Sequence, residues 1–206
     1  ASAASPLKLF LSDFDDNGTI DKIMTKTIDG KDKPVFMKRD INDQIPSTKK
    51  KALKHQEFAT KSIQDLFSSD KVKNAQVDII NYTSSIVAIN NGNGHFAIQK
   101  LPLMAQMSSI HSIVPLDVNQ DGKLDLLVSG NDFYFQPQLG RLDANQGLLL
   151  VNNGNGQFNS LSADATGLRL NGMVRDQKMI QISKGKKILI LQNDMTPLLF
   201  SVSKGH

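Results

Sequence analysis

The sequence contains no cysteine in its 206 residues, which excludes disulfide bonds and thiol catalysis. It also contains no run of 18 apolar residues, so no membrane-spanning helix is predicted. A chain of this length can bury a hydrophobic core, which predicts a single domain or a fragment of one. The missing cysteines do not by themselves determine the compartment in which the chain works.

Recognised catalytic motifs are missing as well. There is no Gly-x-Ser-x-Gly, no His-Glu-x-x-His, no phosphate-binding loop and no Gly-x-Gly-x-x-Gly, the patterns typical of several hydrolases, metalloproteases and nucleotide-binding enzymes. The four histidines, His55, His95, His111 and His206, have no acidic partner at metal-ligand spacing. The sequence therefore predicts a protein that is not an enzyme.

The basic excess, a net charge of +4, is concentrated in one stretch that carries Lys49, Lys50, Lys51, Lys54 and Lys61. Apolar residues at positions 52, 59, 63 and 66 follow a helical spacing. We interpret the lysines as the solvated face of one or two helices within about residues 43–70. Because nothing else in the sequence indicates a nucleic-acid-binding fold, no nucleic-acid partner is expected.

Two nine-residue segments, residues 13–21 and 117–125, share one pattern: oxygen-bearing side chains at positions 1, 3, 5 and 9 and a glycine at position 6. Ca²⁺ is bound by about six to eight oxygen atoms, and a glycine at position 6 permits the sharp turn that directs them to one point. The alternative is an ordinary surface turn, but the same spacing occurring twice favours calcium. Two Ca²⁺ sites are predicted, one formed by Asp13, Asp15, Asn17, Asp21 and the Thr19 carbonyl, the other by Asp117, Asn119, Asp121, Asp125 and the Lys123 carbonyl.

The two segments are not EF-hands. An EF-hand loop ends with a bidentate Glu at position 12 and lies between two helices, whereas position 12 here is Met24 or Val128. The flanking residues form short apolar runs that are partly β-branched, a pattern typical of strands. Each segment is therefore predicted to connect two strands of a β-hairpin.

A second repeat follows each calcium pattern. An apolar run, the string Asn-Asn-Gly-Asn-Gly and a Phe occur at residues 86–96 and again at 148–158, and such Asn-Gly turns predict hairpins. Asp13 precedes Asn90 by 77 residues, while Asp117 precedes Asn152 by 35, so the first unit carries an insertion of about 42 residues. Repeats in a fixed order predict a solenoid or a propeller.

These residues resemble the FG-GAP/VCBS repeat, the blade unit of β-propellers of the integrin α-subunit type. The insertion and the segments around residues 140–144 and 174–194 also resemble the C-terminal region of bacterial VCBS-repeat proteins related to cartilage acidic protein. The resemblance covers about residues 7–201. It implies an all-β fold, bound calcium, and a position at the end of a longer secreted polypeptide.

The expected architecture is a single propeller-type domain, or a C-terminal fragment of one, made of about three blades. The blades are predicted at residues 7–100, with the helical insertion at about 43–70, at 110–160 and at 170–204. Three blades do not close a propeller, which takes about four to eight. We therefore expect further blades, another chain or the helices to cover the open sheet edges.

Residues 130–143 form a turn-rich segment in which Phe133, Tyr134 and Phe135 lie close to Arg141. Aromatic rings with an arginine are typical of protein or sugar contacts, although such rings also fill cores. These four residues are the predicted partner-binding site. The expected function is that of a non-catalytic, calcium-binding extracellular module for protein or glycan interaction, secreted or in the bacterial cell envelope. The alternative is a propeller-based hydrolase or lyase that acts on a polysaccharide.

Overall fold

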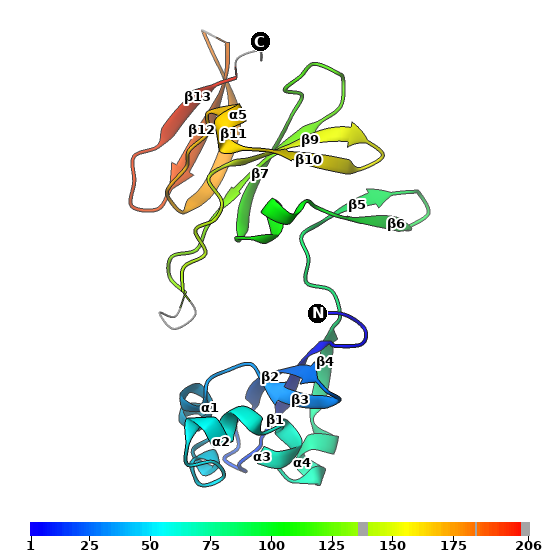
Figure 1. Cartoon of the computed structure of the whole chain (residues 1–206), viewed down its shortest axis with the longest axis vertical. Coiled ribbons are helices and arrows are strands. Elements are labelled where there is room, and N and C mark those ends of the chain that lie inside the picture. The colour runs from blue at the N-terminus through cyan, green and yellow to red at the C-terminus, as the bar shows by residue number, and fades with distance from the viewer. Residues whose placement is uncertain (136–139, 184, 203–206) are drawn as a thin grey trace. The chain divides into compact units, whose positions relative to one another are not determined.

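The structure is a computed structural model that describes residues 1–135, 140–183 and 185–202. It divides into two compact units, Ala1–Thr83 and Ser84–His206 (Figure 1). Most of the described regular structure is antiparallel strand, and the helices are short. The prevalence of antiparallel strands confirms the predicted all-β class. A closed propeller and the number of blades stay predictions. No helix in the described ranges is both long and apolar enough to cross a membrane.

The first unit is built on one antiparallel sheet with the strand order β3-β2-β1-β4. Strand β1 pairs with β2 over the full length of β1, with Leu7 opposite Lys26 and Ser12 opposite Asp21, so the segment of residues 13–21 closes their hairpin as predicted. The strands of this sheet are β1 (Leu7–Ser12), β2 (Asp21–Ile28), β3 (Lys31–Pro34) and β4 (Gln76–Ile80).

The insertion between β3 and β4 folds into short helices that lie together in Figure 1. Helix α3 begins at a capping box in which the Ser62 hydroxyl accepts a hydrogen bond from the Asp65 N–H and the Asp65 carboxylate accepts one from the Ser62 N–H. The helices are α1 (Lys38–Gln44), a 3₁₀ helix (Pro46–Lys50), α2 (His55–Thr60), α3 (Ile63–Leu66) and α4 (Ser69–Asn74).

These helices and the sheet share one core. Phe10 of β1 and Ile23 of β2 are buried in the same cluster as Ile45, Ile63 and other apolar side chains of the insertion. Three of the four positions picked out by the helical spacing, Ala52, Ile63 and Leu66, belong to this core. The fourth, Ala59, is exposed, and its neighbour Phe58 is buried instead. Burial of the apolar faces stabilises helices that are too short to be stable alone.

The second unit contains three antiparallel sheets, with the strand orders β5-β6, β10-β9-β8-β7 and β11-β12-β13. The strands are β5 (Ile86–Asn90), β6 (Phe96–Lys100), β7 (Ile110–Leu116), β8 (Asp125–Gly130), β9 (Leu148–Gly154), β10 (Gln157–Leu161), β11 (Val174–Ile182), β12 (Gly185–Gln192) and β13 (Leu198–Ser201). A 3₁₀ helix (Leu103–Gln106) precedes β7, and α5 (Ala163–Thr166) follows β10.

The four-stranded sheet of this unit has apolar side chains buried on both faces. On one face Leu127 and Leu149 pack with Ile188 of β12. On the other face Leu148 and Leu150 belong to a cluster that includes residues of β5, β10 and the 3₁₀ helix. The strands of a sheet that is covered on both faces have continuous apolar sequences instead of alternating ones. This explains the sequences of β8 and β9.

Buried polar groups tie β11 to the four-stranded sheet. The side-chain amide of Gln177 donates to the carbonyls of Ser112, at 3.1 Å, and Leu127, at 2.6 Å. Its carbonyl accepts from the Ser129 hydroxyl at 3.1 Å. Because these groups are buried, the fully bonded network fixes which residues of the two sheets face each other.

Strands β5 and β6 were expected to continue the sheet of the first calcium segment, but they form a separate two-stranded sheet in the second unit. The insertion explains the difference, because β3 pairs with Thr25–Ile28 of β2. The Val35 N–H and the Gln44 side chain donate to the carbonyls of Met24 and Lys22. In the second repeat the corresponding edge of β8 is taken by β9.

Candidate metal centre

Residues 13–21 (loop 1) and residues 117–125 (loop 2) have the same backbone arrangement. The first Asp of each loop accepts hydrogen bonds from the N–H groups of positions 5 and 6, at 2.9 to 3.1 Å. The ninth-position Asp accepts from the N–H of position 2, at 3.0 Å in loop 1 and 2.9 Å in loop 2. Gly18 and Gly122 have φ values of 84° and 81°, which explains why position 6 requires glycine.

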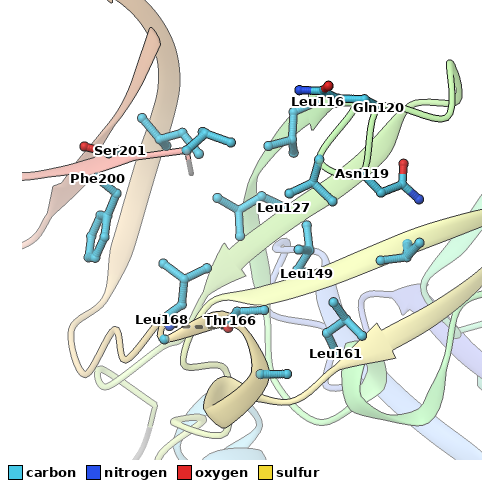
Figure 2. A pocket seen from close by; sticks show the side chains of 16 residues that line it. Leu116, Asn119, Gln120, Leu127, Leu149, Leu161, Thr166, Leu168, Phe200 and Ser201 are labelled. Carbon is cyan, nitrogen blue, oxygen red and sulfur yellow. Dashed lines mark hydrogen bonds between the residues drawn. The ribbon is translucent and has the colours of Figure 1, made fainter. Parts of the chain in front are cut away.

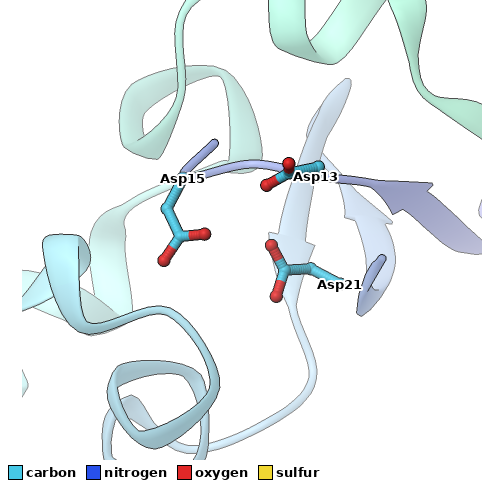
Figure 3. Close-up of side chains that lie close together, drawn as sticks. All are labelled: Asp13, Asp15 and Asp21. Carbon is cyan, nitrogen blue, oxygen red and sulfur yellow. The ribbon is translucent and has the colours of Figure 1, made fainter. Parts of the chain in front are cut away.

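Loop 1 brings three carboxylates together. Asp13, Asp15 and Asp21 each offer one oxygen, and these oxygens lie within 4.8 Å of one another. Figure 3 shows the three side chains directed toward a common point. Asp21 is only 3% exposed, so the cluster is partly withdrawn from water.

One carboxylate oxygen in this cluster is both buried and without a hydrogen-bond partner. It is the Oδ1 atom of Asp15. A buried carboxylate oxygen without a donor or a cation is costly, and Asp15 lies beside two further carboxylates. A hard divalent cation would satisfy it, so the residues of loop 1 fit Ca²⁺.

The pKa values in loop 1 reflect the same arrangement. Burial raises the pKa of Asp21 above its ordinary value, and the charges of Asp15 and Asp13 raise it further. The hydrogen bond from the Gly18 N–H lowers the pKa of Asp13. The raised pKa of Asp21 means that its ionised form is disfavoured beside the other carboxylates of loop 1.

Neighbouring residues anchor loop 1 without entering the cluster. The Lys71 ammonium of α4 donates to the Asp13 carbonyl at 2.6 Å and pairs with Asp16. Phe14 packs on Phe67, with ring centroids 4.4 Å apart. The Asn17 side-chain oxygen accepts from the Thr19 N–H at 2.8 Å and from the Thr19 hydroxyl, so the hydroxyl must release this oxygen before it can bind an ion.

Loop 2 does not gather three carboxylates within the described residues. Asp121 accepts from the Lys123 N–H at 2.9 Å and pairs with the Lys123 ammonium at 3.1 Å, which lowers its pKa. Asp125 accepts from the N–H groups of Val118 and Asn152, one on each oxygen. Calcium binding by Asp117, Asn119, Asp121, Asp125 and the Lys123 carbonyl stays a prediction.

The predicted partner-binding residues lie at the surface of the second unit. Tyr134 is 69% exposed and Phe135 is 42% exposed. The guanidinium of Arg141 lies 3.9 Å from the ring centroid of Phe133, a cation–π contact. The Tyr134 hydroxyl donates to Asp194 at 2.9 Å, and this bond raises the pKa of Tyr134. Residues 136–139 of this segment lie outside the described residues.

The sequence reasoning missed the residues that hold the base of this segment. The buried Asn131 has a φ of 94°, and its side-chain amide donates to the carbonyls of Asn145 and Gly172. Its side-chain oxygen accepts from the Asn145 N–H at 3.0 Å. An Asn next to a Gly at the end of a strand is a known signal for a backbone with positive φ. Asn131 follows Gly130 in this way.

The FG-GAP-like repeat family matches residues 64–128 of this chain. The match includes loop 2 and ends within β8, while loop 1 lies outside it. No curated protein and no solved structure matches the chain significantly.

Proposed function

We propose that this chain is a calcium-stabilised extracellular interaction module without catalytic activity. The observation that carries the proposal is the carboxylate cluster of loop 1 with its buried, unpartnered Asp15 oxygen. The match to an FG-GAP-like repeat in the same chain supports it. Ca²⁺ would be held by Asp13, Asp15 and Asp21, with Asn17 and the Thr19 carbonyl as further oxygen donors.

The role of the ion in this proposal is structural. Bound calcium supplies positive charge that offsets the repulsion among three carboxylates. The chain's own residues hold those carboxylates in place, because Phe14 fixes one end of loop 1 in the core and its N–H binds Asp21. Since the ion binds only the folded loop, it stabilises the fold by mass action.

A calcium titration tests the proposal. We expect isothermal titration to detect Ca²⁺ binding with a Kd of about 10⁻⁴ to 10⁻³ M, the range typical of extracellular modules. The variant Asp15→Asn should abolish this binding at loop 1, and should not destabilise the protein in EDTA because it relieves repulsion. The matched control is Asp29→Asn, in the exposed turn between β2 and β3, which should bind calcium normally. If wild type shows no binding in millimolar calcium, the proposal fails.

The surface around Phe133, Tyr134, Phe135 and Arg141 is the candidate for the interaction itself. Exposed rings together with a stacked guanidinium offer flat faces to a protein pocket or a sugar ring. The double variant Tyr134→Ala and Arg141→Ala should lose capture of the native protein or glycan partner and keep calcium-dependent stability. A control is Leu199→Ala, also exposed in this unit. If the double variant still captures the partner, this surface is not the binding site.

The alternative of a polysaccharide hydrolase or lyase needs paired carboxylates at a cavity. A cavity of about 560 Å³ in the second unit is lined by apolar side chains and by uncharged polar groups such as Asn119 and Thr166 (Figure 2). Among the described residues, no carboxylate lines this cavity, and a group of three carboxylates is found in loop 1. This distribution favours the interaction module. Release of reducing ends from a polysaccharide panel would support the enzyme instead.

A further inference from the structure

The helical insertion contacts loop 1 at two points. The Lys71 ammonium of α4 donates a hydrogen bond to the Asp13 carbonyl at 2.6 Å and forms an ion pair with Asp16. Phe67, between α3 and α4, packs on Phe14 with ring centroids 4.4 Å apart. Lys71 follows Asp13 by 58 residues, so a helix from a distant part of the sequence holds one side of the loop.

Lys71 brings a positive charge to the carboxylates of loop 1. Its side chain is 27% exposed, so the ammonium is partly withdrawn from water. The hydrogen bond to Asp16 raises the pKa of Lys71, and the charges of Asp16, Asp13 and Asp15 raise it further. The ammonium therefore interacts with the whole group of carboxylates, and not with Asp16 alone.

Loop 2 obtains its positive charge from within the loop. There Lys123, at position 7, pairs with Asp121 at position 5, whereas position 7 of loop 1 is the uncharged Thr19. Lys71 contacts loop 1 through the backbone of position 1 and the side chain of position 4. The converging carboxylates are the side chains of positions 1, 3 and 9. An ammonium from α4 thus partly neutralises loop 1 without replacing a cation among these three groups.

We propose that Lys71 sets the calcium affinity of loop 1, by stabilising the calcium-free loop and weakening its attraction for the ion. Ca²⁺ and the ammonium repel each other and are attracted by the same carboxylates. Because linked equilibria are reciprocal, calcium in turn weakens the attachment of Lys71 to the loop. Loop 1 is a calcium site only under the proposed function, so this role of Lys71 rests on that proposal.

A purely structural anchor would have the opposite effect on affinity. Loss of an anchor disorders the loop and weakens calcium binding, whereas loss of a competing charge strengthens it. The Asp16 side chain is 81% exposed, and ion pairs of this kind contribute little to stability. The packing of Phe14 on Phe67 also remains when Lys71 is replaced. We therefore expect the effect of the charge to exceed the effect of the anchor.

Calcium titration of Lys71 variants tests this role. Lys71→Met should bind Ca²⁺ about three-fold or more tightly than wild type by isothermal titration, and should melt at a lower temperature in EDTA. Lys71→Arg keeps the charge and should retain the affinity of wild type. The matched control is Lys73→Met, at an exposed residue of the same helix, which should leave the affinity unchanged. Adding Asp15→Asn to Lys71→Met should remove the gain, which assigns it to loop 1.

Two further measurements identify the effect as electrostatic. The difference in affinity between wild type and Lys71→Met should shrink as NaCl is raised from about 0.02 M to about 1 M, because salt screens the repulsion. Reductive methylation of Lys71, followed by mass spectrometry, should become faster in calcium, while methylation of Lys73 should not change. If Lys71→Met fails to fold, Lys71→Gln removes the charge and keeps a donor for the Asp13 carbonyl.

The outcomes separate this role of Lys71 from the proposed function. Calcium binding by wild type with unchanged or weaker binding by Lys71→Met would overturn the role of Lys71 and leave the proposed function intact. An equal gain in Lys73→Met would also overturn it, since the cause would then be the net charge of the protein. Absence of calcium binding in every variant and in wild type would overturn both.

Discussion

Loop 1 and loop 2 have almost the same backbone and different charge arrangements. Both use the first Asp to bind two N–H groups and the ninth-position Asp to bind a third. In loop 1 the carboxylates of positions 1, 3 and 9 converge. In loop 2 the carboxylate at position 5, Asp121, pairs with Lys123, and position 3 is Asn119. The shared spacing therefore determines the turn, and the residues at positions 3, 5 and 7 determine whether the carboxylates of the loop converge.

The ninth-position Asp shows the same contrast. Both oxygens of the buried Asp125 accept backbone hydrogen bonds, one of them from Asn152 of β9. Asp21 binds the Phe14 N–H through one oxygen and faces two other carboxylates. Asp125 therefore has a structural role through its two backbone hydrogen bonds, while under the proposed function Asp21 gains most of its stabilisation from a bound ion.

The largest expected effect is that of Asp125→Ala. It leaves the N–H groups of Val118 and Asn152 without their acceptor, at about 1–3 kcal/mol each, so we expect a loss of about 3 kcal/mol in the free energy of unfolding. The loss should be present in EDTA as well as in calcium, because the two hydrogen bonds do not need an ion. Chemical denaturation in both conditions measures it. A loss confined to calcium would show that loop 2 is also organised by an ion.

Calcium removal should produce the next largest effect. At a calcium concentration ten times Kd, binding at loop 1 contributes about 1.4 kcal/mol, which EDTA abolishes in the wild type. Asp21→Ala should remove this calcium dependence, and Asp125→Ala should retain it. Thermal melts with and without EDTA compare the three proteins. Calcium dependence that persists in Asp21→Ala would place the ion elsewhere.

Much of the fold follows from local sequence. The strands beside loop 2 and the Asn-Gly hairpin of β9 and β10 lie where their patterns predict them, because turn residues and apolar runs act over a few neighbours. The position of β5 and β6 does not follow, because it depends on how the insertion covers the edge of β2. That cover consists of β3, Val35 and Gln44, and none of them carries a distinctive local signal.

The candidate site was predictable to the same degree. The spacing identified Asp13, Asp15 and Asp21 as a group, and the structure brings them together. The spacing alone did not distinguish loop 1 from loop 2. One difference, Asp15 against Asn119 at position 3, is visible in the sequence, but the other, the ion pair of Lys123 with Asp121, is not. Such a pair depends on side-chain conformation and on neighbouring charge, which a ligand pattern does not contain.

Exchanging position 7 between the loops should shift calcium affinity modestly. Lys123→Thr releases Asp121 from its ion pair and should strengthen binding at loop 2, while Thr19→Lys should weaken binding at loop 1. Because the pair is partly exposed, we expect changes of about 0.2–1 kcal/mol in binding free energy. Isothermal titration of both variants measures them. Equal affinity in all proteins would show that position 7 has no part in the difference between the loops.

The smallest expected effect is on the pH dependence of the calcium-free protein. The pKa of Asp21 is raised from 3.8 by burial and by its acidic neighbours. On acidification Asp21 therefore takes up a proton at a higher pH in the folded state than in the unfolded state. The ionised Asp21 therefore destabilises the fold at neutral pH, and acidification toward its raised pKa relieves this cost. The pKa of Asp13 is lowered from the same value, so its contribution is lost only below 3.8. In EDTA the melting temperature of wild type should gain a small stabilising contribution as the pH falls below neutral, and Asp21→Asn should lack it while Asp29→Asn keeps it. In calcium the sign reverses, because protonation of Asp21 competes with the ion. The same pH response in wild type and Asp21→Asn would show that the carboxylates of loop 1 do not repel one another as their arrangement indicates.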